Sequence, residues 1–339
     1  MILRSFVLAI ALLLLISLIP AAGSVGLSQS SPNIIGQSQS QTKPKPDPQQ
    51  DTPAQDQEAP VRLNSRLVLV PVSASDAAGR PVKDLKVDDI IIEEEGRPQQ
   101  VVALGEPGKT PVEIALLFDV SGSTHAQFAF EQQAAVQFIR AVLKPGDGVS
   151  LFSIGVTPKM VKARTTSGEQ AIAGIMSIGP LKEPTAFFDS IVEATHYLDK
   201  TADSGSRRVL VVISDGEENY SASHTLNDAL RELQKNDCLF YSINPSGGSI
   251  RLNTISTKGQ RFMEAMATET GGKAFNLARV EDLESVFRQI VEELQAQYLF
   301  GYYANDERAG GSFKRITVRA PKRPDLRIRA RQGYYVAKP

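Results

Sequence analysis

The chain of 339 residues carries 37 basic and 38 acidic side chains, and this near balance leaves a formal net charge of -1. Because nucleic-acid binding depends on a basic surface that releases counterions, the balance argues against a nucleic acid as the main partner. The single cysteine, Cys238, excludes an intramolecular disulfide and every zinc or redox site built on cysteine pairs. Any metal would therefore need oxygen or imidazole ligands.

Residues 1–24 are predicted to be a secretory signal peptide. Arg4 precedes an uninterrupted apolar stretch at residues 6–19, and Ala22, Gly23 and Ser24 offer a small-residue cleavage site. The apolar stretch is shorter than the roughly 20 residues that span a bilayer. We therefore expect export to the periplasm or the extracellular space, with cleavage near Ser24. An uncleaved N-terminal membrane anchor is the alternative.

Residues 25–60 are predicted to be a disordered linker. They are rich in Gln, Ser and Pro and contain almost no large apolar side chains. Such a segment cannot bury enough apolar area to offset the entropy lost on ordering.

Two β segments, residues 61–108 and 298–339, flank the middle of the chain. Strands are predicted at residues 67–72, 90–93, 100–104, 299–303, 313–320 and 326–336, with a turn at Gly96. Neither segment has enough strands to form a stable sandwich alone, so we expect the two to build one small β-sandwich together. Its core is predicted to include Leu67, Leu69, Ile90 and Ile92.

The last predicted strand has a regular alternation. Apolar side chains alternate there with Arg327, Arg329 and Arg331, which predicts one buried face and one solvated basic face. Binding of an anionic polymer by these arginines is the alternative.

The middle of the chain, residues 109–297, alternates short apolar runs with amphipathic stretches. Strands are predicted at residues 114–118, 149–154, 209–213 and 239–243, and helices at residues 128–143, 187–198, 225–235 and 281–296. Near-continuous apolar strands joined by helical crossovers indicate a mostly parallel sheet covered on both faces, so we predict a doubly wound α/β domain. In this architecture ligands bind outside the carboxyl ends of the strands.

Oxygen donors follow these strands in the predicted domain. Asp119, Ser121 and Ser123 come directly after the first strand, Asp215 follows the third, and Thr185 precedes a helix. Hard oxygen donors in this number favour Mg²⁺ or Mn²⁺, with Ca²⁺ possible. The alternatives are ordinary roles: helix caps for the residues after the first strand and for Thr185, and a turn at Asp215.

The order DxSxS, then Thr185, then Asp215 resembles the metal-ion-dependent adhesion site of von Willebrand factor type A domains. The phrases DxxGRPVxxLxxDD at residues 76–89, QYLFGYY at residues 297–303 and GYYV at residues 333–336 resemble a narrower group, the exported bacterial proteins of this type that are common in acidobacteria. The narrower resemblance covers most of the chain from residue 63 to residue 336.

The resemblance implies that some of the oxygen donors bind the metal directly and others through water. Ser121 and Ser123 would bind the metal directly, Thr185 directly or through water, and Asp119 and Asp215 largely through water. A carboxylate from a protein partner would fill the open coordination position.

The surroundings of the implied site carry further predictions. Asp189 is expected either to orient the site from outside the coordination shell or to be a solvated carboxylate. Glu217 and Glu218 are expected to form a solvated acidic rim. This sequence departs from the family pattern at Glu183 and Pro184, since the family commonly has a glycine pair before the threonine.

These residues favour an exported metal-dependent protein-binding module, for adhesion or as a scaffold. A structural envelope scaffold with a purely structural metal, and an accessory subunit of an envelope enzyme complex, are the alternatives. Catalysis is not expected, because Asp119, Ser121 and His125 are crowded on one loop, whereas catalytic triads converge from separate elements. The sequence leaves the partner and the oligomeric state open.

Overall fold

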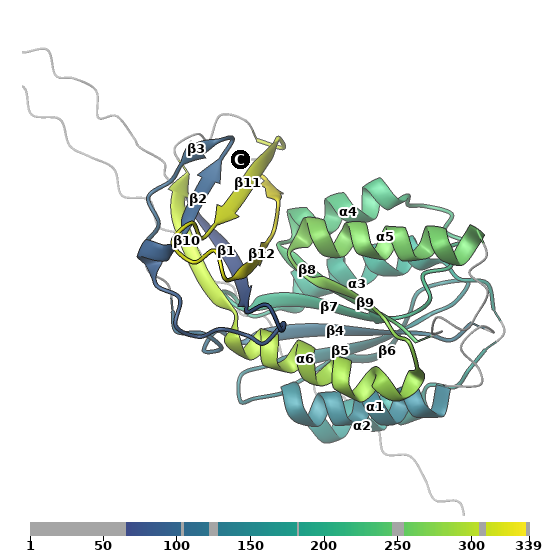
Figure 1. The fold of residues 1–339 in the computed structure, drawn as a ribbon. Coiled ribbons are helices and arrows are strands. Elements are labelled where there is room, and N and C mark those ends of the chain that lie inside the picture. The colour runs from purple at the N-terminus through teal and green to yellow at the C-terminus, as the bar shows by residue number, and fades with distance from the viewer. Residues whose placement is uncertain are drawn as a thin grey trace, which may run out of the picture. The chain divides into compact units, whose positions relative to one another are not determined.

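The computed structural model describes residues 66–102, 105–121, 128–181, 183–245, 254–304 and 310–336, with the backbone alone at 254–256. The predicted signal peptide and linker lie outside these residues. Within them, a six-stranded sheet is covered by helices on both faces, and two smaller antiparallel sheets lie beside it (Figure 1). Over the same ranges, no helix has both the length and the apolar character needed to span a membrane.

The central sheet has the strand order β6-β5-β4-β7-β8-β9. Its strands are β4 (Val112–Asp119), β5 (Gly148–Ile154), β6 (Lys159–Thr165), β7 (Arg207–Ile213), β8 (Cys238–Asn244) and β9 (Lys273–Asn276). All neighbours are parallel except β5 and β6. The predicted doubly wound, mostly parallel sheet is therefore confirmed. The sequence did not indicate β6, because this edge strand lacks buried side chains, or β9, which has only four residues.

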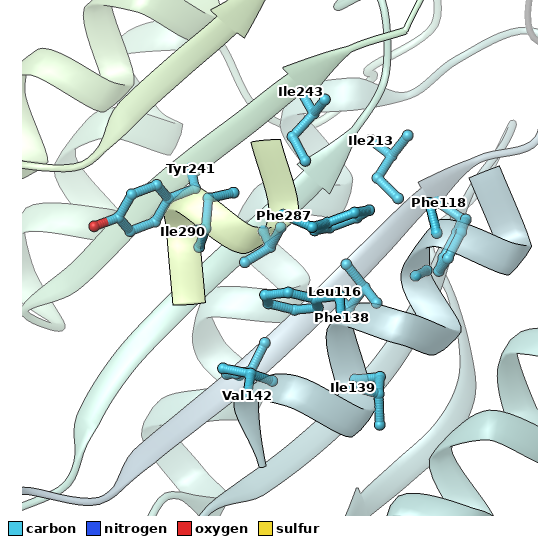
Figure 2. Packing of buried hydrophobic residues seen from close by; sticks show 14 of the residues in the cluster. Leu116, Phe118, Phe138, Ile139, Val142, Ile213, Tyr241, Ile243, Phe287 and Ile290 are labelled. Atoms are coloured by element: carbon cyan, nitrogen blue, oxygen red, sulfur yellow. The ribbon is translucent and has the colours of Figure 1, made fainter. Parts of the chain in front are cut away.

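The helices form two layers, one on each face of the central sheet (Figure 1). One layer contains α1 (Phe128–Val142), α2 (Gly168–Ser177) and α6 (Leu283–Ala296), and the other contains α3 (Phe187–Thr201), α4 (Leu226–Lys235) and α5 (Thr254–Thr270). Side chains of β4 alternate between them: Leu116 packs with the first layer and Leu117 with the second. In the first layer Phe138 stacks on Phe287 with ring centroids 4.7 Å apart (Figure 2).

The two smaller sheets form a sandwich from both ends of the described chain. One sheet has the order β10-β1-β12 and the other β13-β11-β2-β3. The strands are β1 (Arg66–Ser75), β2 (Ile91–Glu94), β3 (Arg97–Pro98), β10 (Tyr298–Ala304), β11 (Phe313–Arg319), β12 (Arg327–Ala330) and β13 (Gly333–Tyr335); the short helices η1 (Val87–Asp89) and η2 (Val280–Asp282) complete the fold. One apolar cluster draws side chains from both sheets, as predicted.

The buried face of β1 is opposite to the predicted one. Val68, Val70 and Val72 are buried, whereas Leu67 is 41% exposed. A shift of one residue in a strand exchanges its two faces, and the apolar residues of β1 run without alternation, so the sequence alone does not fix the buried face. The predicted burial of Ile90 and Ile92 is correct.

Two predicted strands differ in the structure. Glu95 and Gly96 both have positive φ and form a tight hairpin turn, so β3 pairs with β2 directly after the turn. In the predicted strand at residues 100–104, Val102 forms only an isolated bridge. The predicted strand at residues 326–336 is two strands, β12 and β13, which belong to different sheets. At Gly333 a Cβ atom would lie 2.5 Å from the Lys314 carbonyl oxygen, so the chain crosses between sheets where only glycine fits.

Two of the three arginines in this alternation, Arg329 and Arg331, do not lie on a solvated face, whereas Arg327 is exposed. Arg331 is 7% exposed, pairs with Asp237 and donates a hydrogen bond to the Leu69 carbonyl at 2.6 Å. Arg329 pairs with Glu293 of α6. These cations connect the sandwich to the elements of the central domain, so the predicted basic surface is wrong at these two positions.

The junction between α6 and β10 is a single buried residue, Gln297. Its side-chain carbonyl accepts a hydrogen bond from Arg207 at 2.9 Å, and its amide donates to the Ser73 hydroxyl at 3.2 Å. Arg207 also donates to the Leu294 carbonyl at 2.9 Å. One side chain therefore connects the central sheet, the last helix and the sandwich.

Truncation after Gln297 should destabilise the N-terminal part of the sandwich. It removes β10 and β12, which pair with the two edges of β1, and β11, which pairs with β2. The apolar face at Val68, Val70 and Val72 then becomes exposed, so we expect aggregation or rapid proteolysis of residues 66–102. Limited proteolysis with size-exclusion chromatography measures this, and a monomeric truncated chain with residues 66–102 protected would contradict the shared sandwich.

Candidate metal centre

The candidate site begins where β4 and β7, neighbours in the centre of the sheet, both end. Asp119, the last residue of β4, is fully buried. Its Oδ1 accepts a hydrogen bond from the Ser121 backbone at 2.9 Å, and its Oδ2 accepts one from the Ser214 hydroxyl at 2.6 Å. Because Ser214 directly follows β7, this second bond joins the ends of the two strands. The sequence pattern gave no indication of this role for Ser214.

Asp215 lies on a tight loop after β7. Gly216 has a φ of +76°, and the amide of Glu217 donates to Asp215 Oδ1 at 3.1 Å. The backbone of this loop touches Gly259 of α5: a Cβ on Gly259 would lie 2.3 Å from the Gly216 carbonyl oxygen. Helix α5 therefore supports the loop by direct backbone contact, which only glycine permits at both positions. Asp215 itself is 4% exposed.

Thr185 reaches the same loop from the segment before α3. Its amide donates to the Asn219 side chain at 2.8 Å, and its carbonyl accepts from the amides of Asn219 and Tyr220, both at 3.2 Å. The threonine is 1% exposed. The three segments that carry Asp119, Thr185 and Asp215 are thus tied to one another at the carboxyl edge of the sheet.

Glu218 is not part of a solvated rim. One oxygen accepts from the amide of Phe188 at 3.0 Å, in the first turn of α3, and the other from the amides of Tyr220 and Ser221 at 2.9 and 2.7 Å. Its carboxylate therefore fixes the loop after β7 to the start of α3, where a negative charge is favourable. Glu217 is half-buried.

Asp189 lies in the first turn of α3 and contacts the segment before α4. Its Oδ1 is 2.8 Å from His224 Nδ1, and its Oδ2 accepts from the amides of Ala222 and Ser223 at 3.0 and 3.4 Å. The alternative of a solvated carboxylate is therefore wrong. The predicted role of Asp189 toward a metal stays a prediction. Ser123 and His125 lie outside the described residues.

Glu131, on α1, was not identified from the sequence. It is 0% exposed, and neither of its side-chain oxygens has a hydrogen-bond partner in the described part of the chain. Burial and then the charges of Asp119 and Asp215 raise its pKa from 4.5 to about 8. A signal was present in the sequence, because position 131 falls on the apolar stripe of the predicted helix.

Burial also dominates the electrostatics of Asp119. Burial and, to a smaller extent, the charge of Asp215 raise the pKa of this carboxyl from 3.8 to about 6, against the lowering effect of the hydrogen bonds from Ser214 and Ser121. Removing water from neighbouring carboxylates makes their ionised forms unfavourable unless a positive charge is close. The site therefore concentrates unfavourable negative charge at one place.

The residues at this edge fit a hard divalent cation. They provide the hydroxyls of Ser121 and Thr185 and the carboxylates of Asp119 and Asp215, all nearly buried. Oxygen donors of this kind suit Mg²⁺, Mn²⁺ or Ca²⁺. No three His, Cys, Asp or Glu side chains within the described ranges are placed to chelate an ion by themselves. The hydroxyls would consequently be needed as ligands.

The order and placement of these donors agree with the result of a family comparison. The model of the von Willebrand factor type A domain matches residues 113–289, just over half of the chain. The chain belongs to the von Willebrand factor type A family. Domains of this family generally act in protein interaction or adhesion. The match covers the strands and helices that position Asp119, Thr185 and Asp215.

Several solved structures are similar to the von Willebrand factor type A domain of this chain. BatB, a conserved hypothetical protein from Bacteroides thetaiotaomicron, is 18% identical over 54% of this chain and 98% of that one, with a TM-score of 0.43. An aerotolerance-related membrane protein from Bacteroides fragilis is 22% identical over 54% and 98%, with a TM-score of 0.43. The vWF domain of the type V pili tip protein Mfa5 from Porphyromonas gingivalis is 13% identical over 54% and 94%, with a TM-score of 0.45. No curated protein matches the chain by sequence.

The raised pKa values predict that the chelator-treated protein loses stability as the pH rises. A carboxyl whose pKa is higher in the folded state holds its proton more tightly there, so the free energy of unfolding falls as pH increases from about the unfolded to the folded pKa. For Asp119 this window is pH 3.8 to about 6, and for Glu131 it is 4.5 to about 8. We expect a decrease on the order of a few kcal/mol across both windows.

Urea unfolding in chelator between pH 4 and pH 8 measures this dependence. Asp119→Asn removes one of the titrating groups and should flatten the curve below pH 6. Equal slopes for the variant and the native protein would contradict the assignment to Asp119.

Proposed function

We propose that this protein is an exported binding module that captures an acidic side chain of a protein partner through a divalent cation. The observation that carries the proposal is the convergence of Asp119, Ser121, Thr185 and Asp215, from three segments joined by hydrogen bonds, at the carboxyl edge of the central sheet. In doubly wound folds this edge is where ligands bind. Mg²⁺ is the first choice of cation, with Mn²⁺ or Ca²⁺ as alternatives.

Each residue has a separate part in this proposal. The hydroxyls of Ser121 and Ser123 bind the cation directly, and the hydroxyl of Thr185 binds it directly or through water. The carboxylates of Asp119 and Asp215 act mainly through water and are oriented by Ser214 and by the amide of Glu217. When bound, a cation with neutral hydroxyl ligands supplies an electron-poor open position that attracts a carboxylate oxygen.

The hydrogen bonds at the site favour binding over catalysis. The Asp119 carboxylate accepts from Ser214 and from the backbone of Ser121, so it is used to hold the loop. His196 lies 3.1 Å from Glu232, and His224 lies 2.8 Å from Asp189, on other elements of the fold. These contacts support a binding site in which no described histidine acts on Ser121.

We further propose that the protein belongs to the exported bacterial group of the family, on the basis of three sequence phrases and the predicted signal peptide. The phrase at residues 76–89 begins with a turn in which Arg80 donates to Asp76 at 2.8 Å. Tyr302 and Tyr334, from the other two phrases, donate to the same buried carboxylate, Glu94, at 2.6 and 2.9 Å. The three phrases thus have structural roles in the sandwich.

Mg²⁺ or Mn²⁺ should raise the melting temperature, because ligands from three segments stabilise the folded state on binding. Asp119→Ala should abolish this rise while the variant remains folded in chelator. Asp88→Ala, which removes an exposed carboxylate from the sandwich, is the matched control and should keep the rise. Differential scanning calorimetry with titrated metal measures it, and an equal rise in the Asp119 variant would mean that the metal binds elsewhere.

Partner capture separates the proposal from its alternatives. An envelope extract passed over the immobilised protein should yield a retained protein in Mg²⁺ and lose it in chelator, with the circular dichroism spectrum unchanged. Loss of the folded spectrum in chelator would instead indicate a purely structural metal. Retention that is equal in the native protein and in Asp119→Ala would indicate recognition through another surface, such as the sandwich.

A further inference from the structure

Glu131 occupies a core position of α1. The buried face of this helix includes Phe128, Ala135, Phe138 and Val142, and Glu131 lies on the same face, one turn after Phe128. Phe128 in turn contacts Phe118, the residue before Asp119, with ring centroids 6.5 Å apart. The helix therefore places a buried carboxylate, in place of an apolar side chain, one turn away from its contact with the end of β4.

The environment of Glu131 is unfavourable without a cation. The side chain is 0% exposed, and both oxygens lack a hydrogen-bond partner among the residues that the structure describes. The charges that act on it most are those of Asp119 and Asp215, which are also negative. Burying an unpaired ionised carboxylate is strongly destabilising, so Glu131 either holds a proton at neutral pH or has a compensating positive charge close by.

We propose that Glu131 is the third carboxylate of the cation centre and acts from outside the coordination shell, through water or a ligand hydroxyl. This inference rests on the proposed function. No three acidic side chains in the described part of the chain are placed to chelate an ion together, which argues for this outer position. With Glu131 the carboxylates of the site carry three negative charges against the two positive charges of the cation.

The proposal predicts that removing the charge of Glu131 lowers cation affinity without lowering the stability of the metal-free protein. Glu131→Gln keeps the size of the side chain and removes its charge. We expect a loss of Mg²⁺ affinity of about tenfold or more, as for other residues that support metal ligands from the second layer. In chelator the variant should melt at the same temperature as the native protein or higher, because the cost of burying an unpaired ionisable group is removed. A merely structural glutamate would give the opposite change in melting temperature.

The charge of the ion provides a second test. Coulomb energy is proportional to ionic charge, so a tenfold loss for Mg²⁺ corresponds to a loss of roughly thirtyfold for the trivalent ion Tb³⁺. If the substitution only distorted the site, the loss of affinity would not depend on the charge of the ion in this way. Isothermal titration calorimetry gives the Mg²⁺ affinity and terbium luminescence gives the Tb³⁺ affinity.

Glu183→Gln is the matched control, because it removes the same charge from an exposed side chain that reaches Gly155, next to the end of β5. Solvent screening should limit its effect to less than about twofold. If the native protein binds neither ion, the proposed function fails and this proposal with it. Native-like affinity of Glu131→Gln, or a lower melting temperature in chelator, would overturn the role of Glu131 alone.

Discussion

The hydrogen bond from the Ser214 hydroxyl to the Asp119 carboxylate joins the ends of the two central strands, and the candidate metal centre depends on it. The same hydroxyl accepts from the amide of Gly216 at 2.9 Å, so the loop that carries Asp215 is fixed by the same side chain. Thr185 is tied to that loop through Asn219. The oxygen donors are therefore organised by protein hydrogen bonds, which reduces the ordering that a ligand has to impose.

This organisation has an energetic cost that the fold elsewhere offsets. Asp119 and Glu131 are buried, and their raised pKa values show that their charged forms are disfavoured. Large apolar clusters on both faces of the central sheet stabilise the domain around them. Replacing buried ionic groups by apolar ones often stabilises a protein. A role in binding therefore explains why these charged groups are buried better than a contribution to stability does.

Much of the fold, and the placement of Asp119, Thr185 and Asp215 at one edge of the sheet, could be predicted from the sequence. The central strands are uninterrupted apolar runs, and the polar residues after them lie at the edge where parallel strands end. The predictions failed where periodicity is ambiguous or contacts are distant. The apolar run of β1 does not reveal which side faces the core, and the burial of Arg331 depends on Asp237, a residue far away in the sequence. Glu131 was not predicted because one charged residue on the apolar stripe of a helix does not reveal which distant carboxylates lie near it.

The sandwich and the von Willebrand factor type A domain are connected by buried polar contacts at Gln297 and by ion pairs of Arg329 and Arg331. The candidate metal centre lies at the other, carboxyl edge of the central sheet. The most direct test of the account is anomalous X-ray diffraction from crystals of the protein grown with Mn²⁺. The account predicts a peak at this edge, within coordination distance of the Ser121 hydroxyl oxygen and next to Thr185. A Mn²⁺ peak elsewhere, with none at this edge, would contradict it.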